Sequence, residues 1–464
     1  MHRLDPALAR SLADLLGPDR FRTDEPARQQ FGRDWTRFAP ANPSAVALPD
    51  TAAEVQAIVQ LAGEHGCPLV PSGGRTGLSG GAVAAQGELV VALDRMAAIL
   101  ECNPTGRRLV CEAGATTGAI QQAARDQGLM YPVDFASSGS SQIGGNVATN
   151  AGGIQVIRYG MTRDWVTGLK VVSGRGELLD FNGGLLKNNT GLDLRHLMIG
   201  SEGVLGIIVE ATLALTTPPG DPRVMVLGLP SMQAVMAVLD LCRSQLDVLA
   251  FELFSEGSLD KVVAHKGLQA PLSEAQPWYV LMEFDAASSA TELAFDVVER
   301  GMTAGWISDA VVSQSEQQRR ALWRLREEIS ETLSQWTPYK NDISTTVDRV
   351  PALQETLECI VTRRYPEFEV IWYGHVGDGN LHLNVLKPDN LSIADFQSRC
   401  HEVSEEIFAA VADLGGSISA EHGVGLLKKS FLHHSRSASE LALMKGIKAL
   451  LDPRGILNPG KVFD

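Results

Sequence analysis

Several residue types and patterns are scarce in this chain of 464 residues, and each scarcity excludes a class of protein. Six cysteines occur and none forms a CxxC pair, so a disulfide scaffold and a zinc finger are disfavoured and reduced thiols are expected. No run of about 18 apolar residues is present, which argues against a membrane-spanning helix. The N-terminal stretch contains Asp5 and Asp14 and lacks an apolar core, so it does not resemble a signal peptide. These absences predict a cytoplasmic protein.

Positive charge is also in short supply. Lysine and arginine total 40 against 55 acidic residues, which gives a formal net charge of −15. A field of this sign repels phosphate backbones, so neither nucleic acid nor an anionic membrane surface is expected as a partner. The glycine-rich segments match neither GxGxxG nor GxxxxGK[ST], which argues against a Rossmann fold, a P-loop NTPase and an NAD cofactor.

Short apolar runs alternate with amphipathic stretches along most of the chain. In residues 45–215 strand-like runs are separated by helical segments such as 51–66, a pattern that favours an α+β domain. Three prolines and a glycine in residues 216–223 indicate a domain boundary. Beyond it, strands and amphipathic helices, including one over 320–336, follow each other with the spacing of an antiparallel α+β domain.

Three glycine clusters lie within the first of these domains, at residues 71–81, 137–153 and 199–206. Glycine lets backbone N–H groups approach a ligand closely, and successive N–H groups form concave anion sites. Each cluster alone is explained as well by tight turns. Three together, interspersed with serine and asparagine, predict one surface that binds a long diphosphate-bearing ligand.

A second signal lies in residues 370–385, where two strand-like runs flank Gly377-Asp378-Gly379-Asn380. Asp-Gly favours a two-residue type I′ turn, which would make His375 and His382 direct cross-strand partners about 5 Å apart at Cβ. Asn384 would share their face, because strand side chains alternate with period two. Neighbouring imidazoles suit zinc or a similar divalent metal, although an ordinary pair of sheet histidines remains the alternative. Glu421 could complete a His₂Glu site of catalytic type. It could face the metal while its neighbour His422 faces the substrate only if the chain bends, which Gly423 permits.

The three glycine clusters resemble the flavin domain of the vanillyl-alcohol oxidase superfamily, the PCMH-type FAD domain, over about residues 40–215. This resemblance implies two α+β subdomains that bind FAD. A histidine binds FAD covalently in some members, and Arg75 stands in its place here, so non-covalent FAD is expected. The implied cofactor-binding residues are Pro71, Ser72, Gly73, Gly74, Arg75, Thr76, Gly77, Ser79, Asp134, Ser138, Gly139, Gly144, Gly145, Asn146, Thr149, Asn150, Gly152, Gly153, Gly203, Ile207 and Asn458.

The second half extends the resemblance. GHVGDGNLHLN (374–384), SAEHGVG (419–425) and LLDPRGILNPGKVF (450–463) are similar to FAD-dependent D-2-hydroxyacid dehydrogenases. LWRLREEIS (322–330), YKNDIST (339–345) and the second asparagine of GNLHLN resemble the D-2-hydroxyglutarate dehydrogenases most. The expected organisation is an N-terminal arm (1–40), an FAD domain (41–218), an α+β substrate or cap domain with an antiparallel sheet that carries the metal site (219–421), and a C-terminal segment (422–464) that returns to the FAD domain.

The resemblance also implies roles for side chains of the second half. Arg326, whose planar fork suits a carboxylate, would hold the C1 carboxylate of the substrate, and Ser330 would share its helical face at i+4. Ser330 stands where the family pattern has threonine. Lys340 would hold a second, distal carboxylate, and Asn384 and His422 would also contact substrate. As a lone arginine on a helix or a lone lysine, Arg326 and Lys340 would otherwise be surface residues.

The predicted reaction is the oxidation of D-2-hydroxyglutarate to 2-oxoglutarate. In it a metal on His375, His382 and Glu421 binds the C2 hydroxyl, His422 takes its proton, and the C2 hydride passes to flavin N5. The family implies an electron-transferring flavoprotein or a quinone-linked acceptor, and a homodimer is left open. The alternatives are a D-lactate or glycolate dehydrogenase of the same fold, a flavin-free zinc hydrolase, and a non-catalytic FAD- or metal-binding subunit.

Overall fold

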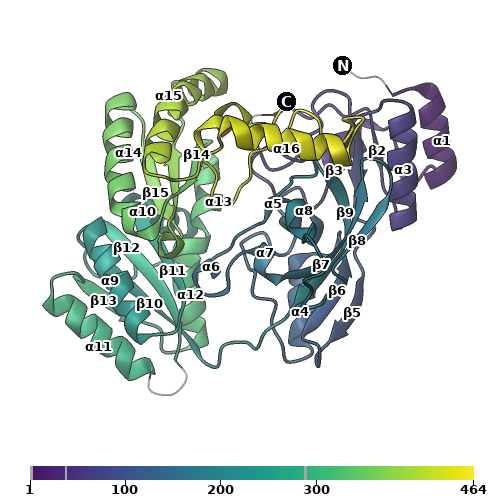
Figure 1. Cartoon of the computed structure of the whole chain (residues 1–464). Helices are drawn as coiled ribbons and strands as arrows, with labels where there is room; N and C mark the ends of the chain where they lie inside the picture. Colours follow the sequence, from purple (N-terminus) through teal and green to yellow (C-terminus); the bar gives the residue numbers. More distant parts are fainter. Residues whose placement is uncertain (1–3, 37–38, 287–289) are drawn as a thin grey trace. The chain divides into compact units, whose positions relative to one another are not determined.

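The computed structural model of the chain describes residues 4–36, 39–286 and 290–464, and these divide into two compact units (Figure 1). The first unit contains Met1–Gly153, Gly160–Pro218 and Glu421–Asp464. The second contains Ile154–Tyr159 and Pro219–Ala420. The chain therefore enters the second unit twice and ends in the first.

The first unit opens with a mixed sheet of order β1-β2-β4-β3, in which β2, β3 and β4 run parallel. Helix α3 (Ala52–Glu64) covers it and begins at Thr51, whose hydroxyl accepts a hydrogen bond from the Glu54 N–H. Helix α1 (Pro6–Leu16) packs beside α3 and buries Leu8, Leu12 and Leu16. The remaining elements of this part are α2 (Glu25–Phe31), β1 (Phe21–Arg22), β2 (Ala45–Ala47), β3 (Leu69–Ser72) and β4 (Leu89–Ala92).

The second sheet of this unit is antiparallel, with the order β5-β6-β9-β7-β8. Its central strand β9 (Gly206–Ala214) is buried along most of its length and shares one hydrophobic core with α3. The other elements are β5 (Ile99–Asn103), β6 (Arg108–Glu112), α4 (Thr117–Arg125), α5 (Ile143–Thr149), α7 (Thr162–Trp165), β7 (Val166–Ser173), β8 (Leu178–Phe181), α8 (Arg195–Met198), η4 (Lys429–His434) and α16 (Ala438–Leu451).

The second unit is built on one antiparallel sheet of order β13-β10-β12-β11-β15-β16-β14. One face packs against α10, α12 and α13 through a core that includes Phe254, Tyr279, Trp323 and Tyr373. Helices α9 and α11 pack together, as do α14 and α15. The strands are β10 (Pro222–Leu229), β11 (Val248–Ser255), β12 (Trp278–Asp285), β13 (Asp309–Val312), β14 (Tyr339–Ser344), β15 (Val370–Gly374) and β16 (Asn380–Val385).

The helices of this unit have clear start signals. Ser231, Ser315 and Ser392 cap α9, α12 and α15, each through its hydroxyl and the N–H three residues later. The helical elements are α6 (Val156–Tyr159), α9 (Met232–Gln245), α10 (Glu256–Lys266), α11 (Ala290–Thr303), α12 (Glu316–Glu327), α13 (Ile329–Leu333), η1 (Ser334–Trp336), η2 (Val347–Arg349), α14 (Val350–Arg364), η3 (Val376–Asp378) and α15 (Ile393–Asp413).

The α+β architecture confirms the fold class expected from the sequence, but two local predictions were wrong. The single helix expected over 320–336 is interrupted at Glu328, where α12 ends and α13 begins, so Arg326 and Ser330 lie on separate helices. The Asp378-Gly379 turn is not type I′, because only Gly379 has a positive φ and that turn needs positive φ at both central residues. Residues 376–378 instead form η3, and His382 pairs with Tyr373 rather than His375.

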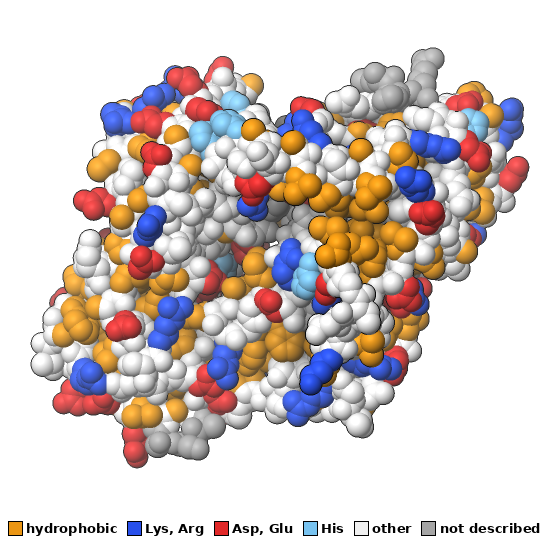
Figure 2. Space-filling view, viewed as in Figure 1, with side chains coloured by type: hydrophobic (Ala, Val, Ile, Leu, Met, Phe, Trp, Pro, Cys, Tyr) orange, Lys and Arg blue, Asp and Glu red, His pale blue; other side chains and the backbone are white. Residues whose placement is uncertain are grey.

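The surface carries both charged side chains and a group of exposed hydrophobic ones. Among the described residues, no helix is both long and apolar enough to cross a bilayer. Acidic and basic side chains are interspersed over the face shown in Figure 2, and hydrophobic side chains gather around α8. The first unit exposes several leucines in this part of the chain: Leu185, Leu186, Leu192, Leu194 and Leu197.

Candidate active site

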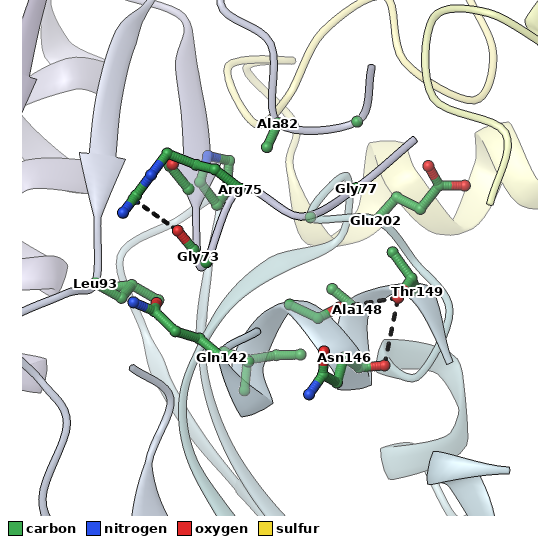
Figure 3. Close-up of a pocket in the computed structure, with 18 of the residues that line it drawn as sticks. Gly73, Arg75, Gly77, Ala82, Leu93, Gln142, Asn146, Ala148, Thr149 and Glu202 are labelled. Carbon is green, nitrogen blue, oxygen red and sulfur yellow. Dashed lines mark hydrogen bonds between the residues drawn. The ribbon is translucent and has the colours of Figure 1, made fainter. Parts of the chain in front are cut away.

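A groove in the first unit is lined by all three glycine clusters (Figure 3). It encloses about 860 Å³ of space outside protein atoms, part of which is open to solvent. A Cβ on Gly74 would lie 2.1 Å from the Ser140 carbonyl oxygen, and one on Gly203 would lie 3.1 Å from Pro71 Cγ. Backbone segments from different clusters therefore approach more closely than a side chain would permit.

Part of the groove wall remains open. Gly145 has nothing within 4 Å of the position where a Cβ would stand, so its backbone borders empty space. Gln142 contributes a buried Oε1 that has no hydrogen-bond partner among the described residues. A long ligand that accepts backbone N–H groups and offers a donor to Gln142 fits this wall.

The groove brings together most of the cofactor residues expected from the sequence. Those that line it are Pro71, Ser72, Gly73, Gly74, Arg75, Thr76, Gly77, Ser79, Gly144, Gly145, Asn146, Thr149, Gly203 and Ile207. Those that do not are Asp134, Ser138, Gly139, Asn150, Gly152, Gly153 and Asn458. Asp134 accepts a hydrogen bond from the Gln121 side chain, and Asn150 accepts one from the Arg163 backbone N–H, so both side chains are engaged by protein groups.

Arg75 contributes its backbone to the groove while its side chain is engaged by protein groups. Its φ is 59°, a left-handed conformation that is uncommon for a residue other than glycine. The guanidinium makes a two-pronged ion pair with Asp94, at 2.7 and 2.9 Å, and donates to the Gly73 carbonyl oxygen at 2.7 Å. It also lies 4.8 Å from the Phe31 ring centroid.

Two acidic residues of the groove were not foreseen from the sequence. Asp34 accepts hydrogen bonds from the N–H groups of Thr36 and Gly80, and burial raises its pKa to about 6. Glu202 is almost fully buried, and burial raises its pKa as well. Glu202 lies inside the third glycine cluster, so its position next to glycine was the only available signal. Asp34 lies far from every cluster in the sequence, and nothing in its surroundings marked it.

The second unit gathers polar side chains on the sheet face that α12 and α13 cover. His375 follows β15 and His382 lies in β16, with their ring centroids 5.2 Å apart. His375 Nδ1 lies 2.8 Å from Glu252 Oε1, and His382 Nδ1 lies 3.5 Å from Asp342 Oδ1. Both histidines are buried, with residue exposures of 8% and 7%. The arrangement therefore has a carboxylate beside one ring nitrogen of each histidine.

Glu252 joins this pair of histidines to Arg326. Its other oxygen, Oε2, lies 2.8 Å from Arg326 Nη2, and the guanidinium also lies over the Tyr373 ring. The ion pair does not have hydrogen-bond geometry, so the buried Nε and Nη2 of Arg326 have no acceptor among the described residues. Two N–H groups on the edge of a buried guanidinium that lack acceptors fit a carboxylate ligand.

Lys340 and Asn384 lie on neighbouring strands of the same face. They are register partners between β14 and β16, two pairs away from Asp342 and His382 and therefore on the same face of the sheet. Lys340 Nζ donates to Ser330 Oγ at 2.8 Å, which places the serine hydroxyl at the lysine despite the helix break. Asn384 is fully buried, and its Oδ1 has no hydrogen-bond partner in the described part of the chain. The face thus presents two cations, two imidazoles, one amide and the two carboxylates of Glu252 and Asp342.

Glu421 and His422, the remaining candidates, belong to the first unit. Glu421 is the first residue of its C-terminal segment, and its Oε1 lies 3.6 Å from His422 Nε2. Both side chains are partly buried. In the second unit, two backbone hydrogen bonds join Ser417 to Ser344 at the end of β14.

Comparisons with known proteins decide the family. Residues 43–182 match the FAD binding domain family, and residues 219–462 match the family of FAD linked oxidases, C-terminal domain. The chain is 52% identical over 461 residues to a D-2-hydroxyglutarate dehydrogenase of Stutzerimonas stutzeri, with 99% of each chain covered. The chain belongs to the D-2-hydroxyglutarate dehydrogenase family of FAD-linked oxidases.

Two further likenesses agree with this membership. A D-2-hydroxyglutarate dehydrogenase of Xanthomonas citri is 53% identical over 461 residues, which cover 99% of this chain and 97% of the relative. The solved structure of p-cresol methylhydroxylase with substrate bound has a TM-score of 0.81 at 15% identity, covers 99% of this chain and 96% of its own, and shows the same fold. The PCMH-type fold and the family expected from the sequence are confirmed, and the flavin-free hydrolase loses its support.

Proposed function

We propose that this protein oxidises D-2-hydroxyglutarate to 2-oxoglutarate with FAD as the acceptor of the hydride. The observation that carries the proposal is the sheet face of the second unit, where Arg326 and Lys340 offer two cations around a pair of buried imidazoles. A dicarboxylate with a hydroxyl beside one carboxylate matches that set of groups. The names of the relatives that are 52% and 53% identical support the same substrate.

The groove of the first unit supports FAD. When bound, FAD supplies an electron acceptor for the C2 hydride of the substrate. Backbone N–H groups of the glycine clusters would hold the diphosphate, and Gln142 would offer its unpaired oxygen to a donor of the cofactor. Because the Arg75 side chain is committed to Asp94, we propose that FAD is held without a covalent bond.

This attachment can be tested directly. Precipitation of the protein with acid or heat should release all of the FAD into the supernatant, where its absorption near ~450 nm measures it. Flavin that stays with the denatured polypeptide would contradict non-covalent binding.

The two histidines fit a divalent metal, with zinc as the first candidate. An Nδ1–H that donates to a carboxylate leaves Nε2 unprotonated, which is the form that binds a metal, and Glu252 and Asp342 occupy the positions for this. When bound, the metal would act as a Lewis acid toward the C2 hydroxyl. Glu421 is the proposed third ligand. It follows Ser417 by four positions in the chain, so the backbone keeps it within about 14 Å of that residue, which pairs with the end of β14.

The chain's own residues divide the remaining work. Arg326 would bind the C1 carboxylate through Nε and Nη2, which donate no hydrogen bond within the described residues, and Lys340 would bind the distal carboxylate. Asn384 would offer its unpaired Oδ1 to a donor of the substrate. His422 would accept the proton of the C2 hydroxyl, because an imidazole titrates close to neutral pH. Fixing the substrate at both ends presents one face of C2 to the hydride acceptor.

The electrons must leave the reduced flavin, and we propose an electron-transferring flavoprotein or a quinone-linked acceptor. The absence of a dinucleotide fingerprint in the sequence supports this over NAD. Stopped-flow reoxidation by each class of acceptor, with NAD as the comparison, would decide the point. Reoxidation by NAD at a rate that matches turnover would contradict the proposal.

The substrate assignment is tested by anaerobic bleaching of the flavin. D-2-hydroxyglutarate should bleach the absorption near ~450 nm with a higher kcat/KM than D-lactate or glycolate, and a chelator should abolish the reaction while FAD stays bound. A preference for D-lactate in the wild-type enzyme would favour the monocarboxylate alternative. The Lys340→Ala variant tests that alternative, because a monocarboxylate has no distal carboxylate for the ammonium to bind.

A further inference from the structure

Glu202 is a buried acid whose two carboxylate oxygens are both used to hold backbone of the C-terminal segment. Oε1 accepts a hydrogen bond from the Val424 N–H at 2.7 Å, and Oε2 accepts one from the Gly425 N–H at 2.8 Å. All three residues belong to the first unit. Figure 3 shows the Glu202 side chain directed toward the C-terminal segment and away from Asn146 and Gln142.

The backbone of Glu202 is held in an uncommon conformation. Its φ is 50°, in the left-handed region that residues other than glycine seldom adopt. Its N–H donates to the Ala148 carbonyl oxygen, and its own carbonyl oxygen accepts from Asn458 Nδ2, each at 2.7 Å. Conformations of this kind persist only where surrounding contacts impose them, and they cluster at functional sites.

The segment on the other side is shaped to receive the carboxylate. A Cβ on Gly423 would lie 2.9 Å from the carboxyl carbon of Glu202, and the φ of 79° at this position favours glycine. A Cβ on Gly425 would lie 2.3 Å from the Ser79 carbonyl oxygen, and the N–H groups of Leu426 and Leu427 donate to that same oxygen. Hydrogen bonds therefore hold the loop 421–425 and the two residues after it to both the first and the third glycine cluster.

We propose that Glu202 is a positioning residue, which fastens the loop 421–425 to the rim of the groove and thereby fixes His422. His422 lies two residues before the first fastened amide, so its backbone has little freedom while both hydrogen bonds hold. The inference rests on the proposed role of His422 as the base. Glu202 itself would not touch the reacting atoms.

The electrostatics agree with an acceptor that holds two amides. Burial raises the pKa of Glu202, while the two N–H donors and the Lys428 ammonium act in the opposite direction. Two N–H groups on two oxygens suit the ionised form, because a protonated oxygen accepts less well. An amide in place of the carboxylate would turn an NH₂ group toward one of the two donors and lose that bond.

The first test compares Glu202→Gln with Glu210→Gln. Glu210 lies on β9 in the same unit and pairs with the partly exposed Lys170, so it is a matched control outside the groove. Amide hydrogen exchange without substrate should accelerate at Val424 and Gly425 by about 10-fold or more in Glu202→Gln and stay unchanged in Glu210→Gln. Unchanged exchange at both amides in Glu202→Gln would overturn the proposal.

The second test asks whether Glu202 acts through His422. With kinetics normalised to bound flavin, Glu202→Gln should lower kcat by about 10- to 100-fold when His422 is present, because misplacement by about 1 Å has effects of this size. In a His422→Ala background the same change should alter kcat by less than about twofold, since the residue to be positioned is gone. Equal losses in both backgrounds would show a role independent of His422.

Glu202→Asp distinguishes the effect of the two hydrogen bonds from the effect of the negative charge. Aspartate keeps the charge but is one methylene too short to reach both amides, so it should accelerate exchange and lower kcat as Glu202→Gln does. Wild-type turnover in Glu202→Asp would show that charge alone matters and would overturn the proposal. The exchange measurements need no substrate, so a wrong substrate assignment would leave them intact, and the kinetics can use whichever D-2-hydroxyacid the wild type oxidises best.

Discussion

The groove of the first unit and the polar face of the second bind their proposed ligands by opposite means. The groove is made largely of backbone, with glycines where the chain must approach a ligand or another segment, and Arg75 turns its charge toward Asp94. The sheet face is made of buried ionisable side chains in pairs, such as Arg326 with Glu252. Backbone N–H groups suit a large cofactor that stays bound, whereas directed side chains suit a small substrate that must be distinguished and released.

The largest effect should come from removing a proposed metal ligand on the sheet face, because this should leave the groove of the first unit unchanged. His375→Ala should lower turnover by at least about 10³-fold, because the Lewis acid would be lost, while the FAD content stays that of wild type. Atomic emission measures the bound metal, and flavin absorption measures the bound FAD. Full activity in metal-free protein would contradict a role for the metal. Equal loss of FAD and metal would contradict separate binding of the two groups by the two units.

The next largest effect concerns the two cations of the sheet face. Lys340→Ala should lower kcat/KM for D-2-hydroxyglutarate by roughly 30-fold to several thousand-fold, since truncating one partner of a buried charged contact costs about 2–5 kcal/mol. It should spare D-lactate, which lacks the distal carboxylate. Arg326→Ala should lower kcat/KM for both substrates, because both carry the C1 carboxylate.

The kcat/KM values for both substrates in wild type and both variants decide the matter. An equal loss on the two substrates in Lys340→Ala would make the lysine a structural residue and remove the local support for a dicarboxylate.

A third experiment tests the groove by filling it. Gly145→Val should lower FAD affinity by about 10- to 100-fold, because its Cβ position borders the empty space of the groove, where a side chain would take the place of the ligand. Gly446→Val is the matched control, since Gly446 also lies in a helix, α16, and has nothing within 4 Å of its Cβ position, but does not line the groove. Flavin retained after gel filtration measures the difference. Equal retention in both variants would place the cofactor elsewhere.

The smallest effect is a pH dependence in the groove. The pKa of Asp34 is raised from 3.8 to about 6, so the folded state holds this proton more tightly than the unfolded chain does. Its contribution to stability therefore increases as pH falls from about 7 toward 4 and is lost as pH rises through about 6. Relative to Asp34→Asn, wild type should gain about 1 kcal/mol in free energy of unfolding between pH 7 and pH 5. Denaturant titrations at pH 7 and pH 5 measure it, and a difference that does not change with pH would contradict the raised pKa of Asp34.

The hairpin at 370–385 shows why part of the second site could be predicted and part could not. The predicted register was wrong by two residues, because Asp-Gly was read as a two-residue turn and the chain forms η3 instead. A shift of two keeps every side chain on its face, whereas a shift of one would reverse it. The predicted proximity of His375 and His382 was therefore correct although the register was wrong. Their partners Glu252 and Asp342 come from strands far away in the sequence, and no local pattern pointed to them.

The sequence by itself determined the elements that depend on local chemistry. Serine and threonine caps, period-two and period-3.6 apolar patterns and glycine clusters specify where helices, strands and close backbone approaches occur, and the motifs along the chain marked the family. Only the tertiary structure decided which distant groups meet: Glu252 between His375 and Arg326, and Glu202 beneath the loop that carries His422. The physical reason is that a buried acid needs hydrogen-bond donors, and these donors come from segments distant in the sequence. The order of the strands and the path of the C-terminal segment determine which donors are near, and local sequence patterns do not specify either.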